Sequence, residues 1–274
     1  MRKRAFIWIL AAGLLAAAPA AGAAGATRSD GSTAAPASVV KAVRSVPSTT
    51  LDFVGLGALR SGIALTRLSG AAVAPGSRAT VISMNTAWCP HCAANSWALA
   101  ITLGRFGTLT GLRVIDSGTF YGTFFRANPS YPHTKGLSFL KARYTSRLVS
   151  FQPIVLGDRT GRPVQTPTRS QARALRSFDP SGGVPAVYLG GAYGVVGSAT
   201  SPRLLAGLSA PKIASELADP TSALAPYIDG QANILTAALC VATGQQPASV
   251  CGSAGVRAAA ATLPPPPGGK TVFA

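Results

Sequence analysis

Two cysteines separated by two residues, in Cys89-Pro90-His91-Cys92, constrain the fold of this 274-residue chain more than any other feature. A β-prone run at 80–85 precedes them, and an Ala- and Leu-rich stretch follows, with an apolar stripe that continues to Phe106. Residues 112–115 have the composition of a second strand. We therefore expect a β-α-β unit whose helix begins at the cysteine pair.

The position of the pair at the start of a helix indicates redox chemistry. Free backbone N–H groups and the positive end of the helix dipole favour a thiolate there. Cys89, nearer to solvent, is expected to be the nucleophile that forms a mixed disulfide, and Cys92 the thiol that resolves it. Pro90 stands where a missing N–H costs little. His91 is placed to give the thiolate a hydrogen bond or a positive charge, and Trp88 to shield one side of the pair.

Two other roles for the Cys-x-x-Cys spacing remain open. It can supply half of a zinc site, but a second half is missing, because Cys240 and Cys251 lie far along the chain with ten residues between them. It can also be an inert structural disulfide. Only two histidines and one glutamate, Glu216, are present, which argues against a zinc hydrolase or a two-carboxylate glycosidase. We expect neither a metal nor a cofactor.

A second signal lies far from the cysteine pair in sequence. Residues 182–185, Gly-Gly-Val-Pro, precede a β-prone run at 186–189, and a Gly-Gly pair links that run to another at 192–196. Two β-prone runs joined in this way predict a β-hairpin. A helix with a proline at its start is expected at 202–217.

With these motifs the chain resembles the thioredoxin-like oxidoreductases from residue 80 to about 217. The Cys-Pro-His-Cys sequence at 89–92 is similar to that of the oxidising periplasmic disulfide-forming enzymes, the DsbA group. The resemblance implies an α/β fold with a central mixed sheet flanked by helices. It also implies a cis Pro185 opposite the cysteines, with the backbone of Val184 facing Cys89 and pairing with a substrate peptide as a strand does.

A closer resemblance is to an uncharacterised exported family, domain of unknown function 929. The similar stretches span most of the chain after the N-terminal segment and are found at 88–94, 97–99, 150–153 and 246–251. Members of that family commonly have tyrosine at the position of His91. The family name implies no activity.

The segment 118–175 departs from a minimal thioredoxin. It is rich in aromatic residues and has β-prone runs at 137–144 and 148–156. A short helix is expected at 171–178. We expect this segment to be an insertion before the strand that follows Pro185.

Two further residues are weaker candidates for the site. Asp116, near the end of the expected second strand, is a candidate proton acceptor for Cys92. The acceptor of thioredoxins lies before the Cys-x-x-Cys, but here no acidic residue stands between Asp52 and Cys89. His133 is expected to be a loop residue and, as the sharper alternative, a substrate contact.

The N-terminus has the pattern of an export signal. A basic start at 2–4 is followed by an uncharged, mostly apolar stretch and by Ala-x-Ala sites up to residue 26. Residues 1–26 are therefore expected to be a signal peptide, with an uncleaved N-terminal anchor as the alternative. In both cases the protein is exported, as a secreted or cell-envelope protein.

The charge of the chain is strongly one-sided. It carries 25 Lys and Arg against 8 Asp and Glu, a formal net charge of +17. Anionic surfaces are possible partners of such a protein, although a solvated basic surface needs none. The basic residues are scattered and form no nucleic-acid-binding motif, so no nucleic acid is expected as a partner.

Four parts are expected along the chain. After the segment 1–26, residues 27–75 are expected to form a flexible tether and N-terminal extension, and 76–218 the thioredoxin-like domain. Residues 219–274 are expected to form a helical C-terminal extension, in which Cys240 and Cys251 make a structural disulfide that export permits.

The sequence favours an exported thiol–disulfide oxidoreductase that oxidises substrate dithiols through a Cys89–Cys92 disulfide. Its partners would be thiols of secreted or envelope proteins and a membrane redox partner, such as a quinone-linked protein. One alternative is a reductase or isomerase with the same cysteines. Another is a non-catalytic cell-envelope binding protein on a thioredoxin-like scaffold.

Overall fold

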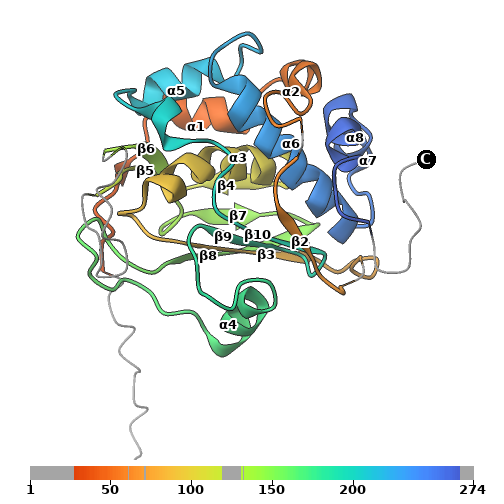
Figure 1. Ribbon diagram of the computed structural model, residues 1–274, viewed down its shortest axis with the longest axis horizontal. Coiled ribbons are helices and arrows are strands. Elements are labelled where there is room, and N and C mark those ends of the chain that lie inside the picture. The colour runs from red at the N-terminus through yellow and green to blue at the C-terminus, as the bar shows by residue number, and fades with distance from the viewer. Residues whose placement is uncertain (1–27, 61, 71, 119–130, 132, 266–274) are drawn as a thin grey trace, which may run out of the picture.

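The structure is a computed structural model that describes residues 28–60, 62–70, 72–118, 131 and 133–265 (Figure 1). The export signal expected at 1–26 and the aromatic residues at 120–125 lie outside the described residues. Within the part described, no helix has the length and apolar character needed to cross a membrane.

A five-stranded mixed sheet forms the centre of the molecule. Its strand order is β2 (Leu65–Arg67), β10 (Tyr193–Val196), β9 (Ala186–Leu189), β3 (Ala79–Asn85) and β8 (Val149–Val155). β3 and β8 run parallel, and the other neighbours are antiparallel. The expected hairpin is confirmed as β9–β10.

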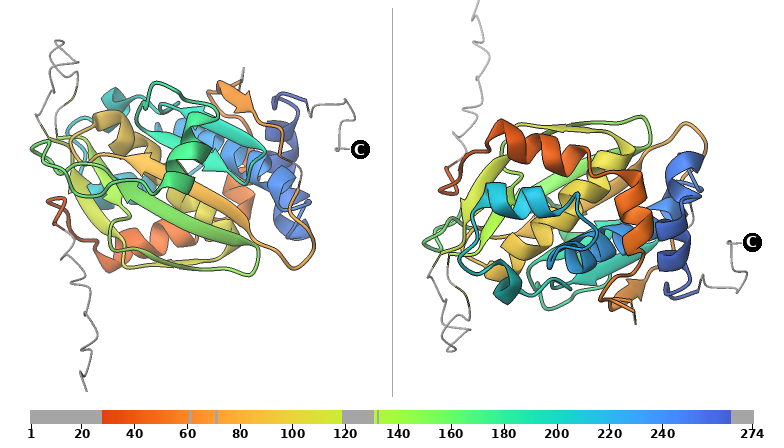
Figure 2. Two further views of the ribbon diagram at one scale, coloured as in Figure 1. Left: turned by 90° about the horizontal axis from the view of Figure 1, so that it is seen from below. Right: turned by 90° about the horizontal axis from the view of Figure 1, so that it is seen from above.

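Helices cover both faces of this sheet, but unequally. The cysteine-bearing helix α3 (Pro90–Phe106) and α6 (Ala225–Ala242) pack against each other on one face, whereas the short α4 (Arg169–Arg176) lies on the other (Figures 1 and 2). Successive residues of a strand point to opposite faces. Accordingly, Val81 joins the large core under α3, and Ile82 and Met84 join the smaller core with Leu175 of α4.

The second strand of the β-α-β unit is not the one expected. Residues Arg113–Asp116 do form a strand, β5, but it belongs to a separate sheet with β1 (Thr33–Ala34) and β6 (Lys135–Ser138). The parallel neighbour of β3 is β8 instead. Gly111, with φ +69°, turns the chain after β4 (Thr108–Thr110), so that the next strand enters a hairpin away from the central sheet.

The extra segment therefore lies earlier in the chain than expected. It runs from the end of α3 to the start of β8 and holds β4 to β7, in which β4 pairs with β7 (Arg143–Thr145). The run at 148–156, expected inside the insertion, is a strand of the central sheet. Periodicity alone does not distinguish a central strand from a strand in an insertion.

The N-terminal part expected to be a tether instead forms packed helices. These are α1 (Ala37–Arg44) and α2 (Ser48–Val54), which lie with α5 (Ala210–Glu216) on the outer side of α3 and α6. Val39 and Val43 stand one helical turn apart and are buried. The Ser- and Thr-rich composition predicts a tether, but burial of this short apolar stripe against the core stabilises a helix.

The C-terminal part also belongs to the core. α6 is buried along nearly its whole length, and it is followed by α7 (Ala248–Cys251) and α8 (Ala254–Ala260). The predicted disulfide between Cys240 and Cys251 is confirmed, with an S–S distance of 2.01 Å, and it ties α7 to the end of α6. The helix expected at 202–217 is interrupted, because Gly207, with φ +74°, separates η1 (Pro202–Leu205) from α5.

Candidate functional site

The first turn of α3 places the two cysteines. Cys89 is the N-cap residue in an extended conformation, and its Sγ accepts a hydrogen bond from the backbone N–H of Cys92 at 3.3 Å. Pro90 follows as the first helical residue, where no N–H partner is needed. An N-cap side chain that accepts from the third helical residue is the usual way to begin a helix. Here a sulfur fills that role, and the same contact brings the two cysteines together.

The two thiols differ in acidity. The pKa of Cys89 is lowered from 9.0 by a hydrogen bond from the Cys92 side chain and by the backbone N–H groups of Cys92 and His91, with burial acting against them. The pKa of Cys92 is raised well above 9.0, first by burial and then by its hydrogen bond to Cys89 and the charge on that sulfur. Cys89 therefore loses its proton first, and Cys92 keeps its own.

Cys89 is less accessible than the sequence suggested. Its exposed fraction is 6%, against 5% for Cys92, and both are unbridged thiols in this structure. The exposed residue of the motif is His91, and Trp88 before it is partly exposed. The two cysteines are therefore almost equally buried, and exposure alone does not distinguish them.

His91 acts on the thiolate through its backbone. Its N–H lowers the pKa of Cys89, whereas burial of part of the imidazole lowers the pKa of His91 itself below 6.5. An imidazole with a lowered pKa is neutral at pH 7. The positive charge that the sequence analysis expected from the His91 imidazole is therefore absent at neutral pH.

The Gly-Gly-Val-Pro loop lies directly beside Cys89. The Val184–Pro185 peptide bond is cis, the isomer that the resemblance implied. The Sγ of Cys89 lies 4.0 Å from the carbonyl oxygen of Val184, a contact between residues 95 positions apart. On its other side the loop is held by the Gly197 N–H, which donates to the Pro185 carbonyl at 2.7 Å. The fold thus brings Cys89, Cys92, Val184 and Pro185 into one site.

Thr86 belongs to this site although the sequence analysis did not select it. Its hydroxyl and its backbone lie against Cys92, where their hydrogen bonding opposes the rise of the Cys92 pKa. The Thr86 hydroxyl is buried and has no oxygen or nitrogen partner among the described residues. The sequence signal for Thr86 is its position directly after the strand that leads to the cysteines. A hydroxyl there can contact the cysteine pair, as a carboxylate can.

Asp116, the candidate proton acceptor for Cys92, lies in a cluster of ion pairs and is not among the groups that shift the pKa of Cys92. One of its carboxylate oxygens pairs with Lys135 at 2.9 Å, with His133 at 3.4 Å and with Arg159 at 3.6 Å. These cations hold the carboxylate in an ion-pair cluster. His133 has 59% of its side chain exposed and lies in the loop expected for it.

Two members of this cluster, Asp116 and Lys135, belong to the sheet that packs against the start of α3. A Cβ placed on Gly136 of β6 would lie only 2.4 Å from the Cα of Ala93, which follows Cys92. β6 and the first turn of α3 are therefore in direct backbone contact. In the residues that the structure describes, no three His, Cys, Asp or Glu side chains gather in a way that would hold a metal ion.

Comparison with known proteins finds similarity to one family over part of the chain. A family model described as domain of unknown function (DUF929) matches residues 64–177. The match includes β3, the cysteine pair, α3, the extra segment, β8 and α4, but it ends before Val184. It is thus shorter than the resemblance suggested, since the stretch at 246–251 lies outside it. No curated protein and no solved structure matches the chain.

Proposed function

We propose that this protein is a thiol–disulfide oxidoreductase of the thioredoxin-like class, which oxidises substrate dithiols through a Cys89–Cys92 disulfide. One observation carries the proposal: an acidified Cys89 at a helix start lies beside a cis Val184–Pro185 bond, next to a Cys92 that keeps its proton. Perturbed pKa values of opposite direction in one site are typical of catalytic pairs.

The connectivity of the central sheet supports the fold assignment. β3 leads through α3 to the parallel strand β8, α4 then crosses the opposite face, and the β9–β10 hairpin follows the cis proline. α6 returns to the face that α3 covers. This order resembles the thioredoxin-like plan, with a segment inserted between α3 and β8.

The proposed reaction begins with the cysteine pair in its disulfide form. A substrate thiolate attacks the Sγ of Cys89, a mixed disulfide forms, and the bond to Cys92 breaks. The sulfur of Cys92 takes up a proton, because its pKa is raised. We propose attack at Cys89 because its sulfur lies beside the Val184 carbonyl, where the loop with the cis proline would pair with a substrate peptide.

The second exchange releases the product. A second substrate thiolate attacks the substrate sulfur of the mixed disulfide, and Cys89 leaves as a thiolate stabilised by the helix N–H groups. The substrate has lost two protons and two electrons, and the pair has gained the electrons. Reoxidation requires an electron acceptor, which we propose to be a quinone-linked membrane protein.

Export completes the proposal. The basic and apolar pattern of residues 1–26 supports it. The Cys240–Cys251 disulfide supports it too, because such bonds persist in oxidising compartments. The substrates would then be thiols of secreted or envelope proteins, and the basic surface would suit anionic surroundings.

The reduction potential of the Cys89–Cys92 pair tests this function. The full chain is equilibrated in glutathione buffers, the thiols are alkylated, and each cysteine pair is quantified separately by mass spectrometry. An oxidase is expected to have a reduction potential of about −120 mV. A reduction potential of about −270 mV would indicate the reductase or isomerase alternative.

One observation favours the non-catalytic alternative. Both thiols are buried, as expected for a structural bridge on a scaffold that only binds a ligand. A Cys89–Cys92 bridge that resists physiological thiols in the same titration would exclude the oxidoreductase and support this binding protein.

A further inference from the structure

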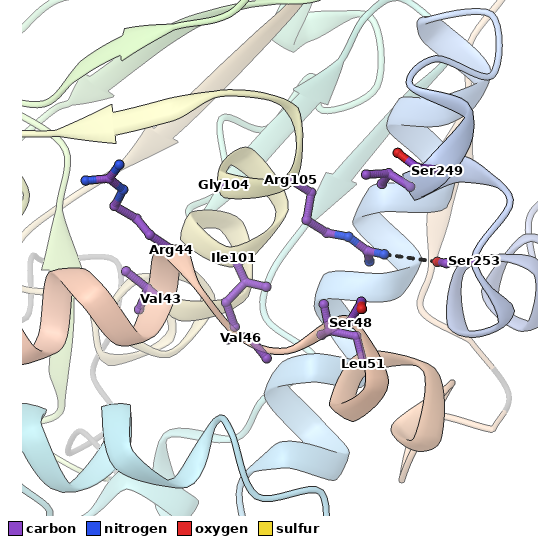
Figure 3. A pocket seen from close by; sticks show the side chains of 11 residues that line it. Val43, Arg44, Val46, Ser48, Leu51, Ile101, Gly104, Arg105, Ser249 and Ser253 are labelled. Atoms are coloured by element: carbon purple, nitrogen blue, oxygen red, sulfur yellow. Dashed lines mark hydrogen bonds between the residues drawn. The ribbon is translucent and has the colours of Figure 1, made fainter.

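A pocket lies at the opposite end of α3 from the cysteine pair (Figure 3). It is bounded by α1, α2, the last turns of α3 and the turn between α7 and α8, and its volume is about 220 Å³. Arg105, which lines it, stands thirteen residues after Cys92 on the same helix. At a rise of about 1.5 Å per residue, the two positions are separated by roughly 20 Å. The pocket is therefore a separate site.

The polar centre of this pocket is the guanidinium of Arg105. It donates to Asn233 Oδ1 at 2.8 Å, to Ser253 Oγ at 3.0 Å and to Thr236 Oγ1 at 3.5 Å. All three acceptors are neutral. A guanidinium has five N–H groups, so three bonds leave donors for a ligand. Figure 3 shows the side chain reaching across the pocket toward Ser253.

This cation has no counter-ion at contact distance. Across the described residues, no carboxylate forms an ion pair with Arg105. Asp52 acts on it at longer range, while its Oδ1 accepts the Gly255 N–H at 2.8 Å. Burial lowers the pKa of Arg105 to about 10, so the group is charged at neutral pH. A partly buried charge without a paired charge favours an anion that completes the pair.

The remaining walls are mostly apolar. The apolar residues that line the pocket with the guanidinium are Val43, Val46, Leu51, Ile101 and Val250. Since one water takes about 30 Å³ of liquid, the volume is that of several waters rather than a single bridging one. A ligand that fits must combine an anionic head with a hydrocarbon body.

The disulfide holds one wall of this pocket in place. Val250 directly precedes Cys251, and Ser253 follows it by two residues. Cys251 is bonded to Cys240 of α6. Asn233 and Thr236, which orient Arg105, also stand on α6. The covalent bond thus joins the element that orients the cation to the wall that faces it.

We propose that this pocket binds a small organic carboxylate, with the carboxylate on Arg105 and a short alkyl chain against the valine, leucine and isoleucine side chains. This proposal does not depend on the redox function. Arg44, at the exposed rim, adds a second positive charge that attracts the anion without contacting it as closely.

Titration calorimetry of the full chain with sodium hexanoate tests this proposal, and hexan-1-ol is the uncharged comparator. Hexanoate is expected to bind at one site, and hexan-1-ol at least about tenfold more weakly, because it lacks the charge-assisted hydrogen bonds. Arg105→Gln should weaken hexanoate binding by a similar factor. The matched control is Arg173→Gln on the distant helix α4, which makes the same change of charge and should leave binding unchanged.

A second variant keeps the test valid if Arg105→Gln does not fold. Ser249 lines the pocket and is exposed, and its hydroxyl forms no hydrogen bond with Arg105. Ser249→Phe should fill the space and abolish binding while the protein stays folded. The proposal is overturned if hexanoate does not bind, if hexan-1-ol binds equally well, or if Ser249→Phe leaves binding unchanged.

Discussion

At the scale of single residues, the hydrogen bond between the two sulfurs, the helix start and burial make the two cysteines differ in acidity. The helix start provides N–H groups for the Cys89 sulfur, and the pKa of His91 is lowered, so its imidazole is neutral at pH 7. Burial then separates the two thiols further by raising the pKa of Cys92. The asymmetry therefore depends first on the hydrogen bond between the two sulfurs and on the burial of Cys92, and position 91 contributes only a backbone N–H.

The difference in pKa predicts a difference in alkylation. In the reduced protein, Cys89 should react with iodoacetamide at lower pH than Cys92, because only the thiolate reacts. Its rate should fall as the pH drops through its lowered pKa. Mass spectrometry of the alkylated cysteines across a pH series measures both rates, and His91→Ala should leave the Cys89 profile nearly unchanged.

The roles of the two sulfurs predict what each serine variant traps. In Cys92→Ser the Cys89 thiolate can still exchange with a substrate disulfide, which is the reverse of the proposed release step, but no Cys92 thiol is present to displace the bound substrate. This variant should therefore accumulate mixed disulfides with substrate proteins, whereas Cys89→Ser should trap none. Non-reducing gels of the two variants, expressed in the same cells, make the comparison. Similar adducts in both would contradict the assignment of Cys89 as nucleophile.

Asp229 predicts a pH dependence of stability. This residue of α6 is fully buried, neither carboxylate oxygen has a partner among the described residues, and burial raises its pKa from 3.8 to about 8. The folded state therefore keeps a proton that the unfolded state releases above pH 4. The free energy of unfolding should fall as pH rises from about 4 to 8 and then level off, at a cost of up to several kcal/mol.

Asp229→Asn should remove this dependence. The stability of the variant relative to the wild type should increase between pH 5 and pH 8, as measured by urea unfolding at each pH. A constant difference would show that the carboxyl group does not titrate in this window.

At the scale of elements, the contact between β6 and α3 supports the site. Gly136 lies against Ala93, the residue directly after Cys92. This contact determines how closely β6 and the first turn of α3 approach each other. The sheet that carries Asp116 and Lys135 is thereby held beside the cysteines. The extra segment is thus part of the surroundings of the pair.

Gly136→Ala is expected to disturb this contact. Its Cβ would meet backbone atoms that have no flexible end to move, so a loss of about 1–3 kcal/mol in unfolding free energy is expected. The iodoacetamide profile of Cys89 should shift with it. Gly104→Ala, at a helical position where the nearest atom is 3.4 Å away, is the control and should cost nothing.

At the scale of the whole molecule, helices from both ends of the chain close over α3. α1 and α2 come from the N-terminal part and α6 from the C-terminal part, and all three contact α3 or each other. α6 is buried along most of its length, and the Cys240–Cys251 bond fastens its end to α7. We therefore expect the stability of the fold to depend on this disulfide, which does not involve Cys89 or Cys92.

Removing that disulfide should destabilise the whole protein. The bond closes a loop of sequence separation 11, for which chain entropy gives about 3 kcal/mol. Urea unfolding of Cys240→Ser/Cys251→Ser against the wild type measures the loss. Cys89→Ser/Cys92→Ser, which removes the same number of sulfurs, is the matched control and should lose much less.

The sequence by itself determined the local elements that carry strong signals. The strand before the cysteines, the helix that begins at them, the β9–β10 hairpin and the Cys240–Cys251 pair are all present as predicted. The strand, the helix and the hairpin depend on periodicity, a cap or a turn within a short stretch of chain, and the disulfide joins two cysteines only eleven positions apart. The resemblance added the cis bond at Pro185.

Only the tertiary structure decided which elements meet. It selected β8 over β5 as the parallel neighbour of β3, buried Cys89, and placed Thr86 against Cys92. It also packed a Ser- and Thr-rich N-terminal segment onto the core and left Arg105 facing a pocket. These outcomes depend on contacts between residues far apart in the chain, and local patterns contain no information about the partner that each apolar face finds.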